Sequence, residues 1–212
     1  KLAWAAAQWA HDRPLVSCRF DTTGQYVFCG SEDRVVERFR LSDGARTLLE
    51  GGHQTWVNAF AFSSDGAVVI SGGCDGRLCW WTATADVPQL VRTVPGHGTS
   101  WVRALAASPD GTVLASGGND NMVRLWNLAD GTLLRVRQAL GDGIGGTALT
   151  VGDPITLSWR ADACIRYCRC ALQDGGGVAD WGQGRGATFQ RRARYVLGRF
   201  CPRDHGAGGA TL

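Results

Sequence analysis

Lysine is almost absent from this sequence, and so is any long apolar run. Lys1 is the only lysine among 212 residues, so arginine supplies the other positive charges, a bias more typical of a GC-rich gene than of a function. No apolar segment approaches the roughly 20 residues of a membrane-spanning helix, and no signal-peptide pattern is present. The formal net charge of +3 is too small to indicate nucleic-acid binding. We therefore expect neither a membrane nor a nucleic acid as partner.

Paired cysteine spacing is also lacking in the first 140 residues. Cys18, Cys29, Cys74 and Cys79 each stand alone in an expected strand or turn. Isolated cysteines of this kind are typical of small buried thiols, and free thiols persist in a reducing compartment. The sequence therefore predicts a cytoplasmic protein.

The sequence does contain an internal repeat with three landmarks, a histidine, an aspartate and a closing aromatic residue. From histidine to aspartate is 22, 22 and 23 residues, and from aspartate to the aromatic residue is six in each copy. Successive aspartates lie 42 and 45 residues apart. A period of this length indicates a repeat architecture. The landmarks are His11, Asp33 and Phe39, then His53, Asp75 and Trp81, then His97, Asp120 and Trp126.

Each copy is expected to form four short β-strands. In the third copy, apolar Val123 and Leu125 flank Arg124, the alternation of a strand. The phrases Ser-Pro-Asp-Gly at 108–111 and Gly-Asn-Asp-Asn at 118–121 favour turns. The expected strands of this copy are 102–107, 112–117, 122–127 and 133–138.

Units of this length, with Gly-His near the start and Trp-Asp near the end, resemble the WD repeats of β-propellers. The resemblance covers residues 9–138, and Leu-Ala-Ser-Gly-Gly at 114–118 looks especially like bacterial members. It implies an all-β fold class, a partial β-propeller of three four-stranded WD-type blades plus an irregular C-terminal tail. Three blades do not close a propeller, so we expect a fragment of a larger one. The blades would be 9–51, 52–94 and 95–138 in a propeller segment 1–140, with 1–9 a possible outer strand of a preceding blade.

The resemblance also implies a structural hydrogen-bond network in each blade, in which His, Ser, Asp and Trp satisfy buried polar groups. The first copy keeps His11 and Asp33 but has Cys29 and Phe39 at the other two positions, so we expect apolar packing to hold it. The members would be His53, Ser71, Asp75 and Trp81 in the second blade, and His97, Ser116, Asp120 and Trp126 in the third.

Partners of the family dock where the inner strands begin. The resemblance places Trp56 and Asn58 there in the second blade, Trp101 and Arg103 in the third, and Asn119 in a nearby turn. Residues two apart on a strand share a face, and exposed Trp and Arg often dominate binding. The alternative is that both tryptophans simply cover the junctions between blades.

After residue 140 the repeat stops. Residues 141–212 contain nine arginines but neither lysine nor glutamate, so we expect an irregular or disordered tail, or a frameshifted one. Five residues of the tail could bind zinc, but they do not have zinc-knuckle spacing, which disfavours a metal site. They are Cys164, Cys168, Cys170, Cys201 and His205. The Arg-rich stretch 185–203 is read as a solvated basic tail.

The function that these observations favour is a non-catalytic scaffold for protein–protein interaction, with an unknown protein partner. A catalytic reading of His, Asp and Ser is disfavoured, because the serines lie within strands and lack a nucleophile-elbow sequence. We expect no enzyme activity, no cofactor and no metal. Two alternatives stay open: a regulatory WD module of a larger, bacterial kinase-like enzyme, and a non-functional truncated fragment.

Overall fold

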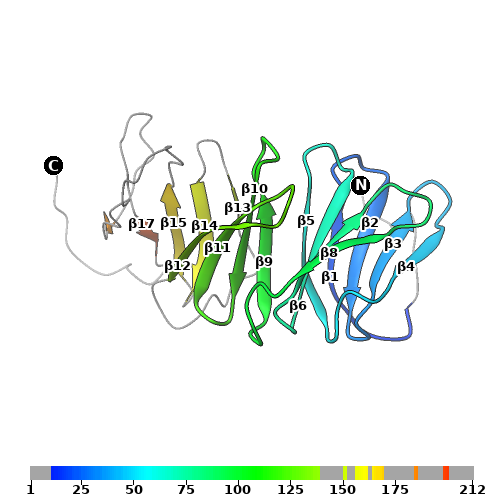
Figure 1. Ribbon diagram of the computed structural model, residues 1–212, viewed down its shortest axis with the longest axis horizontal. Helices are drawn as coiled ribbons and strands as arrows, with labels where there is room; N and C mark the ends of the chain where they lie inside the picture. The colour runs from blue at the N-terminus through cyan, green and yellow to red at the C-terminus, as the bar shows by residue number, and fades with distance from the viewer. Residues whose placement is uncertain are drawn as a thin grey trace, which may run out of the picture. The chain divides into compact units, whose positions relative to one another are not determined.

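The computed structural model describes residues 11–138 together with five short pieces of the tail (Figure 1). The chain divides into two compact units, Lys1–Val102 and Arg103–Leu212. Within the described part of the chain, no helix is long and apolar enough to cross a membrane. The strand expected at residues 1–9 lies outside the described residues.

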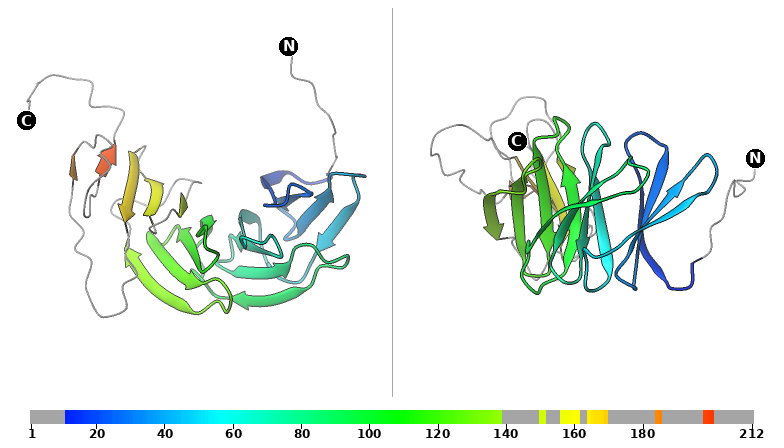
Figure 2. Two further views of the ribbon diagram at one scale, coloured as in Figure 1. Left: turned by 90° about the horizontal axis from the view of Figure 1, so that it is seen from above. Right: turned by 45° about the vertical axis from the view of Figure 1, so that its right-hand side comes forward.

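The first unit contains two four-stranded antiparallel sheets, blade 1 and blade 2, in which each strand pairs with the next along the chain (Figures 1 and 2). Blade 1 consists of β1 (Leu15–Phe20), β2 (Tyr26–Ser31), β3 (Val36–Arg40) and β4 (Arg46–Leu49). Blade 2 consists of β5 (Val57–Phe62), β6 (Val68–Gly73), β7 (Leu78–Thr82) and β8 (Leu90–Val94).

Blade 3 has the same antiparallel order. Its first strand begins at Val102, the last residue of the first unit, and the rest of the blade belongs to the second unit. The predicted strands of this copy agree with the structure to within one residue, so the all-β fold class of three four-stranded blades is confirmed. The strands are β9 (Val102–Ala107), β10 (Val113–Gly118), β11 (Met122–Asn127) and β12 (Leu133–Gln138).

The described tail residues pair in one sheet with the order β13-β14-β15-β17-β16. Of the five possible zinc ligands, Cys164 and Cys168 lie in the strand Cys164–Arg169. Cys170, Cys201 and His205 lie outside the described residues. The irregular or frameshifted tail stays a prediction. The strands are β13 (Thr150–Val151), β14 (Thr156–Ala161), β15 (Cys164–Arg169), β16 (Gly184–Arg185) and β17 (Gly198–Phe200).

In each blade, the turn between the first two strands begins at a Ser or Asp and has a glycine three residues later. In blade 3, the Ser108 hydroxyl donates to Asp110 and accepts from the Val113 amide, and Asp110 accepts from the Thr112 amide. Gly111 has φ +72°, a left-handed conformation that glycine adopts without strain. Gly66 occupies the same position in blade 2, with φ +70°. Local chemistry therefore fixes both hairpins.

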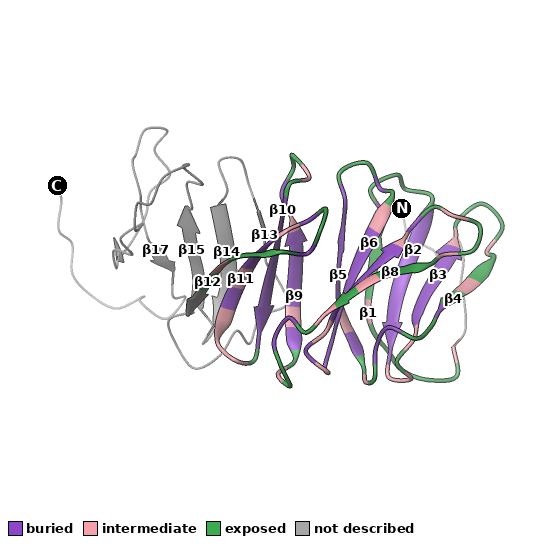
Figure 3. Cartoon of the chain, in the orientation of Figure 1, coloured by how far each residue is buried: buried purple, intermediate pink, exposed green. Residues whose placement is uncertain are grey.

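The packing core of the first unit lies between blades 1 and 2, where β1 and β2 contact β5. Phe28 of β2 meets Phe62 of β5 edge to face, with ring centroids 5.3 Å apart. Full burial of such a side chain contributes about 1.5–3 kcal/mol to stability. Figure 3 shows buried residues on the middle strands β2, β3 and β6, and exposed residues on the outer strands β4 and β8; β7 is also mostly buried.

Arg38 joins blade 1 to blade 2 from inside the core. Its side chain is 1% exposed, and Nη1 donates to the carbonyls of Ala83 and Ala85 at 2.7 Å each. Its guanidinium carbon lies 4.7 Å from the Tyr26 ring centroid. Burial lowers the pKa of Arg38. Carbonyl acceptors and an aromatic face therefore surround the guanidinium at the position that Trp80 occupies in blade 2.

Three of the four isolated cysteines are buried free thiols, as the sequence predicts, but Cys18 is exposed. The buried ones behave as apolar groups: burial raises the pKa of Cys29 to about 11 and that of Cys79 to about 12. Cys18 departs from the prediction because every residue of β1 is at least partly exposed. The equivalent β5 is almost wholly buried, since blade 1 packs on it.

Candidate functional site

Blade 2 contains a continuous chain of hydrogen bonds through its four predicted network residues. The Trp81 indole N–H donates to Ser71 Oγ at 2.8 Å. Ser71 Oγ lies 2.7 Å from His53 Nε2, and His53 Nδ1 lies 3.3 Å from Asp75 Oδ1. Asp75 accepts a further bond from the Gln54 amide at 2.7 Å. The chain links the start of the blade to β6 and β7.

Only one arrangement of protons satisfies every member. Trp81 is a donor only, so the Ser71 hydroxyl accepts from it and donates to His53 Nε2. Nδ1 then carries the imidazole proton and donates it to Asp75. The space is tight, because a Cβ on Gly73 would lie 2.5 Å from His53 Nδ1 and 2.6 Å from the Asp75 carboxylate. Glycine at this position therefore lets the imidazole and the carboxylate meet.

The Asp75 carboxylate should make the stability of blade 2 depend on pH. Burial raises its pKa, but the hydrogen bonds from His53 and Gln54 outweigh this effect, and its pKa lies below the ordinary value. A depressed folded-state pKa contributes stability above the unfolded value near 3.9, and this stability is lost as pH falls through the folded pKa. We expect the free energy of unfolding to decrease as the pH is lowered below about 4. Asp75→Asn should flatten this dependence in urea titrations between pH 3 and 6; an unchanged slope would contradict it.

In blade 3, Trp126 Nε1 donates to Ser116 Oγ at 2.9 Å, which repeats the first link of blade 2. The Asp120 carboxylate accepts from the Met122 amide at 3.1 Å and from Arg124 at 2.5 Å. His97 is buried and belongs to the first unit, where its amide donates to the Gly76 carbonyl at 2.8 Å. Its pairing with Asp120 of the second unit stays a prediction.

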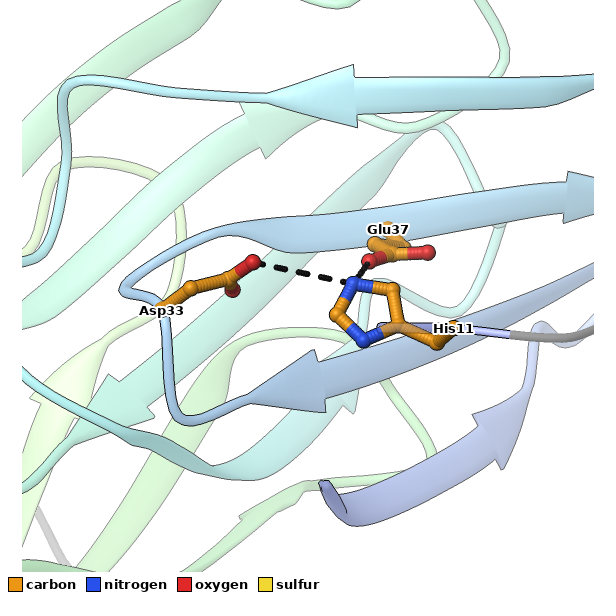
Figure 4. Close-up of side chains that lie close together, drawn as sticks. All are labelled: His11, Asp33 and Glu37. Atoms are coloured by element: carbon orange, nitrogen blue, oxygen red, sulfur yellow. Dashed lines mark ion pairs between the residues drawn. The ribbon is translucent and has the colours of Figure 1, made fainter. Parts of the chain in front are cut away.

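Blade 1 holds a polar network of its own, where apolar packing was expected. His11 Nε2 contacts a carboxylate oxygen of the fully buried Glu37 and lies 3.6 Å from Asp33 Oδ2 (Figure 4). Arg46 binds both Glu37 oxygens, with Nε 2.8 Å from Oε2 and Nη2 2.9 Å from Oε1. Ser31 stands where blade 2 has Gly73, and its hydroxyl donates to Asp33. The His11 imidazole therefore contacts Glu37, whereas the His53 imidazole of blade 2 is bonded to Ser71.

Sequence reasoning missed Glu37 and Arg46. The available signal was a charged residue in the strand Val36–Arg40 at a position that is Cys79 in blade 2. A carboxylate there is facing the core and needs a partner. Arg46 provides one from the neighbouring strand, because the register places it within reach across β3 and β4. Long-range register of this kind cannot be read from the repeat period.

The predicted binding residues of the first unit form a small aromatic surface, the Trp surface, made of Trp56, Asn58 and Trp101. The two indoles contact each other, with ring centroids 6.4 Å apart and planes inclined at 42°. Trp56 is 42% exposed and Trp101 is 39% exposed. The Asn58 amide donates to Cys74 Sγ and to the Val102 carbonyl. The surface is thus aromatic and partly open to solvent, and Asn58 beside it is held by two hydrogen bonds.

In the second unit, the two remaining predicted residues contact each other. Arg103 Nε donates to Asn119 Oδ1 at 2.8 Å, and the bond is exposed. This contact joins the inner strand β9 to the turn after β10 and orients the guanidinium. Because the pair lies outside the buried hydrogen-bond networks, the blade does not need these two side chains for its core.

Comparison with protein-family models finds the family described as "WD domain, G-beta repeat" at residues 7–37, 46–82 and 88–127, which together cover half of the chain. A curated relative is "Small ribosomal subunit protein RACK1y" of Oryza sativa subsp. japonica, 44% identical over 59 residues, 27% of this chain and 17% of that protein. Another is "Pre-rRNA-processing protein pro-1" of Caenorhabditis elegans, 26% identical over 99 residues, 39% of this chain and 19% of that protein.

Solved structures agree on the fold. "Crystal structure of RRP9 WD40 repeats" superposes with a TM-score of 0.70 at 21% identity, and "Structure of U3-55K" with 0.69 at 20%. In each case the match covers 76% of this chain and 50% of the other. The chain thus spans half the length of these propellers and about a fifth of the curated relatives. Three matched repeats, three four-stranded sheets and the blade 2 network place this chain in the WD40 repeat family.

Proposed function

We propose that this chain is a non-catalytic, cytoplasmic scaffold that binds a protein partner through the Trp surface of its first unit. The observation that supports the proposal is the pair of touching indoles, each about two-fifths exposed. Large aromatic side chains dominate the affinity of many protein interfaces. Two such residues side by side on a folded surface are a costly exposure that a partner would relieve.

The geometry of blade 2 supports a non-catalytic role. Ser71 is fully buried, and its hydroxyl is bonded to Trp81 and His53. A nucleophilic serine must instead present its oxygen at a pocket with an oxyanion hole beside it. We also propose a bacterial type of repeat from the phrase Leu-Ala-Ser-Gly-Gly at 114–118, although the two relatives named above come from a plant and a nematode.

RNA is the rival partner, because the names of two relatives refer to the ribosome and to pre-rRNA processing. A formal charge of +3 over 212 residues argues against it. Binding to a phosphate backbone needs several positive contacts and weakens steeply with salt. The partner test therefore includes an arm in which RNA is digested.

The test is capture of partners from an extract of the source organism with the full chain. Trp56→Ala/Trp101→Ala should lose the captured protein, because the aromatic contacts are gone. The matched control is Leu90→Ala/Val91→Ala on the outer strand β8, which removes exposed apolar residues of 39% and 54% exposure. Loss with the control alone would show that the assigned surface is wrong. Capture that disappears after ribonuclease treatment would replace the protein partner by RNA.

A further inference from the structure

The cluster in blade 1 has the composition of a metal site. His11 Nε2 and one carboxylate oxygen each from Asp33 and Glu37 lie within 4.8 Å of one another (Figure 4). The side chains of His11 and Glu37 are 4% and 0% exposed, whereas that of Asp33 is 37% exposed. Two ligands are therefore fixed inside the blade and the third lies at the solvent edge.

The cluster contains two carboxylates and one guanidinium. Asp33 and Glu37 carry two negative charges when ionised, and Arg46 supplies one positive charge against them. A buried carboxylate is stable only when it is paired or bound to a metal. The carboxylates therefore outnumber the guanidinium beside them, and a bound cation would balance the second negative charge.

The orientation of the imidazole allows the metal-bound state. His11 Nδ1 lies 2.6 Å from the Arg13 carbonyl oxygen, so an Nδ1–H can donate to it. Metal-bound histidines usually hold their other ring N–H in this way, which aims the free nitrogen at the ion. The Arg13 amide donates to the same Nδ1 at 2.9 Å. Metal binding at Nε2 therefore requires the imidazole proton to lie on Nδ1 and to be donated to the Arg13 carbonyl in place of this bond.

We propose that blade 1 binds a divalent transition cation through His11, Asp33 and Glu37. One imidazole nitrogen and two carboxylates, with a fourth position open to water, suit ions such as Zn²⁺ and Co²⁺. Arg46 keeps its bond from Nε to Glu37 Oε2, while Oε1 turns to the cation; Arg46 is partly exposed and can withdraw its Nη2. Blade 2 has Cys79 at the position of Glu37 and so has one carboxylate where blade 1 has two.

The test is calorimetric titration of the full chain with Co²⁺. The wild type should bind one ion, and Asp33→Asn or Glu37→Gln should weaken binding at least about tenfold, since even outer-shell changes cost 10–100-fold. The matched control is Asp75→Asn, the same position in blade 2, which should bind like the wild type. Circular dichroism records folding, and the partly exposed Asp33 keeps the test valid if Glu37→Gln does not fold.

Absorption separates this site from the tail cysteines. Co²⁺ held by nitrogen and oxygen lacks the intense near-ultraviolet band of a thiolate complex, so the bound wild type should show no such band. Binding should also weaken in acid, because the ligands must be deprotonated. The proposal is overturned if Co²⁺ does not bind, if Asp33→Asn binds as tightly as the wild type, or if the only bound ion shows the thiolate band. The cluster is then a proton-balanced ion network.

Discussion

Replacing Trp81 by alanine should lower the free energy of unfolding by about 3–5 kcal/mol, the usual cost of removing a buried Trp. Its side chain is 1% exposed, and a Cβ on Gly52 would lie 2.4 Å from the indole, so the ring fills its space completely. The substitution also leaves the buried Ser71 hydroxyl without its donor. Urea-induced unfolding followed by circular dichroism measures the loss.

Trp81→Phe separates the hydrogen bond from the packing. Phenylalanine keeps much of the apolar ring and removes the indole N–H, so it should cost about 1–3 kcal/mol, the range for one unsatisfied buried group. Blade 1 carries Phe39 at this position, where Cys29 stands in place of Ser71 and needs no donor. A Trp81→Phe variant as stable as the wild type would show that the network contributes nothing to blade 2.

Arg46→Ala should destabilise blade 1 by about 3 kcal/mol, because it leaves the fully buried Glu37 without its guanidinium partner. Both carboxylate oxygens lose a charge-assisted hydrogen bond. The effect lies at the lower end of the range for buried pairs, since the Arg46 side chain is 41% exposed and water can enter. Unfolding in urea is again the measurement.

The control for this prediction is Arg40→Ala. Arg40 pairs with Asp43 at 3.3 Å, and both side chains are well exposed. Exposed ion pairs contribute about 0–1 kcal/mol, so this variant should be nearly as stable as the wild type. Equal losses at Arg40 and Arg46 would mean that burial of Glu37 is not what makes the pair important.

The sequence predicts the blades well because their signals are local. Ser108, Asp110 and Gly111 are sufficient for a hairpin, and the six-residue spacing from Asp75 to Trp81 fixes where the next strand closes. The same repeat placed the blade 2 network, since each of its members lies at a fixed offset from the turn. Short-range spacing and turn chemistry do not depend on the rest of the molecule.

The polar network of blade 1 is harder to predict from sequence, because its residues find partners on other strands and in the next blade. Arg38, at the position that Trp80 occupies in blade 2, binds carbonyls of that blade more than 40 residues away along the chain. Glu37 meets Arg46 on one side and His11 on the other, which only the register of β3 and β4 and the path of residues 11–13 bring together. A pattern of single residues carries no information on such meetings.

The exposure of the Trp surface could not be read from sequence either. A tryptophan before the inner strand is compatible with a junction cover or with a docking residue, and only the fold gives the exposed fraction of each indole. The two rings contact each other, and each is about two-fifths exposed. This exposure favours the Trp surface as the binding site of the partner.

Two quantities test the Trp surface most directly. They are the affinity of the captured protein partner for Trp56→Ala/Trp101→Ala and the unfolding free energy of the same variant. Truncation of two hot-spot residues should weaken binding at least about thirtyfold, or about 2 kcal/mol. Its unfolding free energy should stay within about 1 kcal/mol of the wild type, because surface substitutions rarely change stability more. Wild-type affinity in the variant would contradict the assigned surface, and unfolding of the variant would show that the two tryptophans are structural covers of the blade junction.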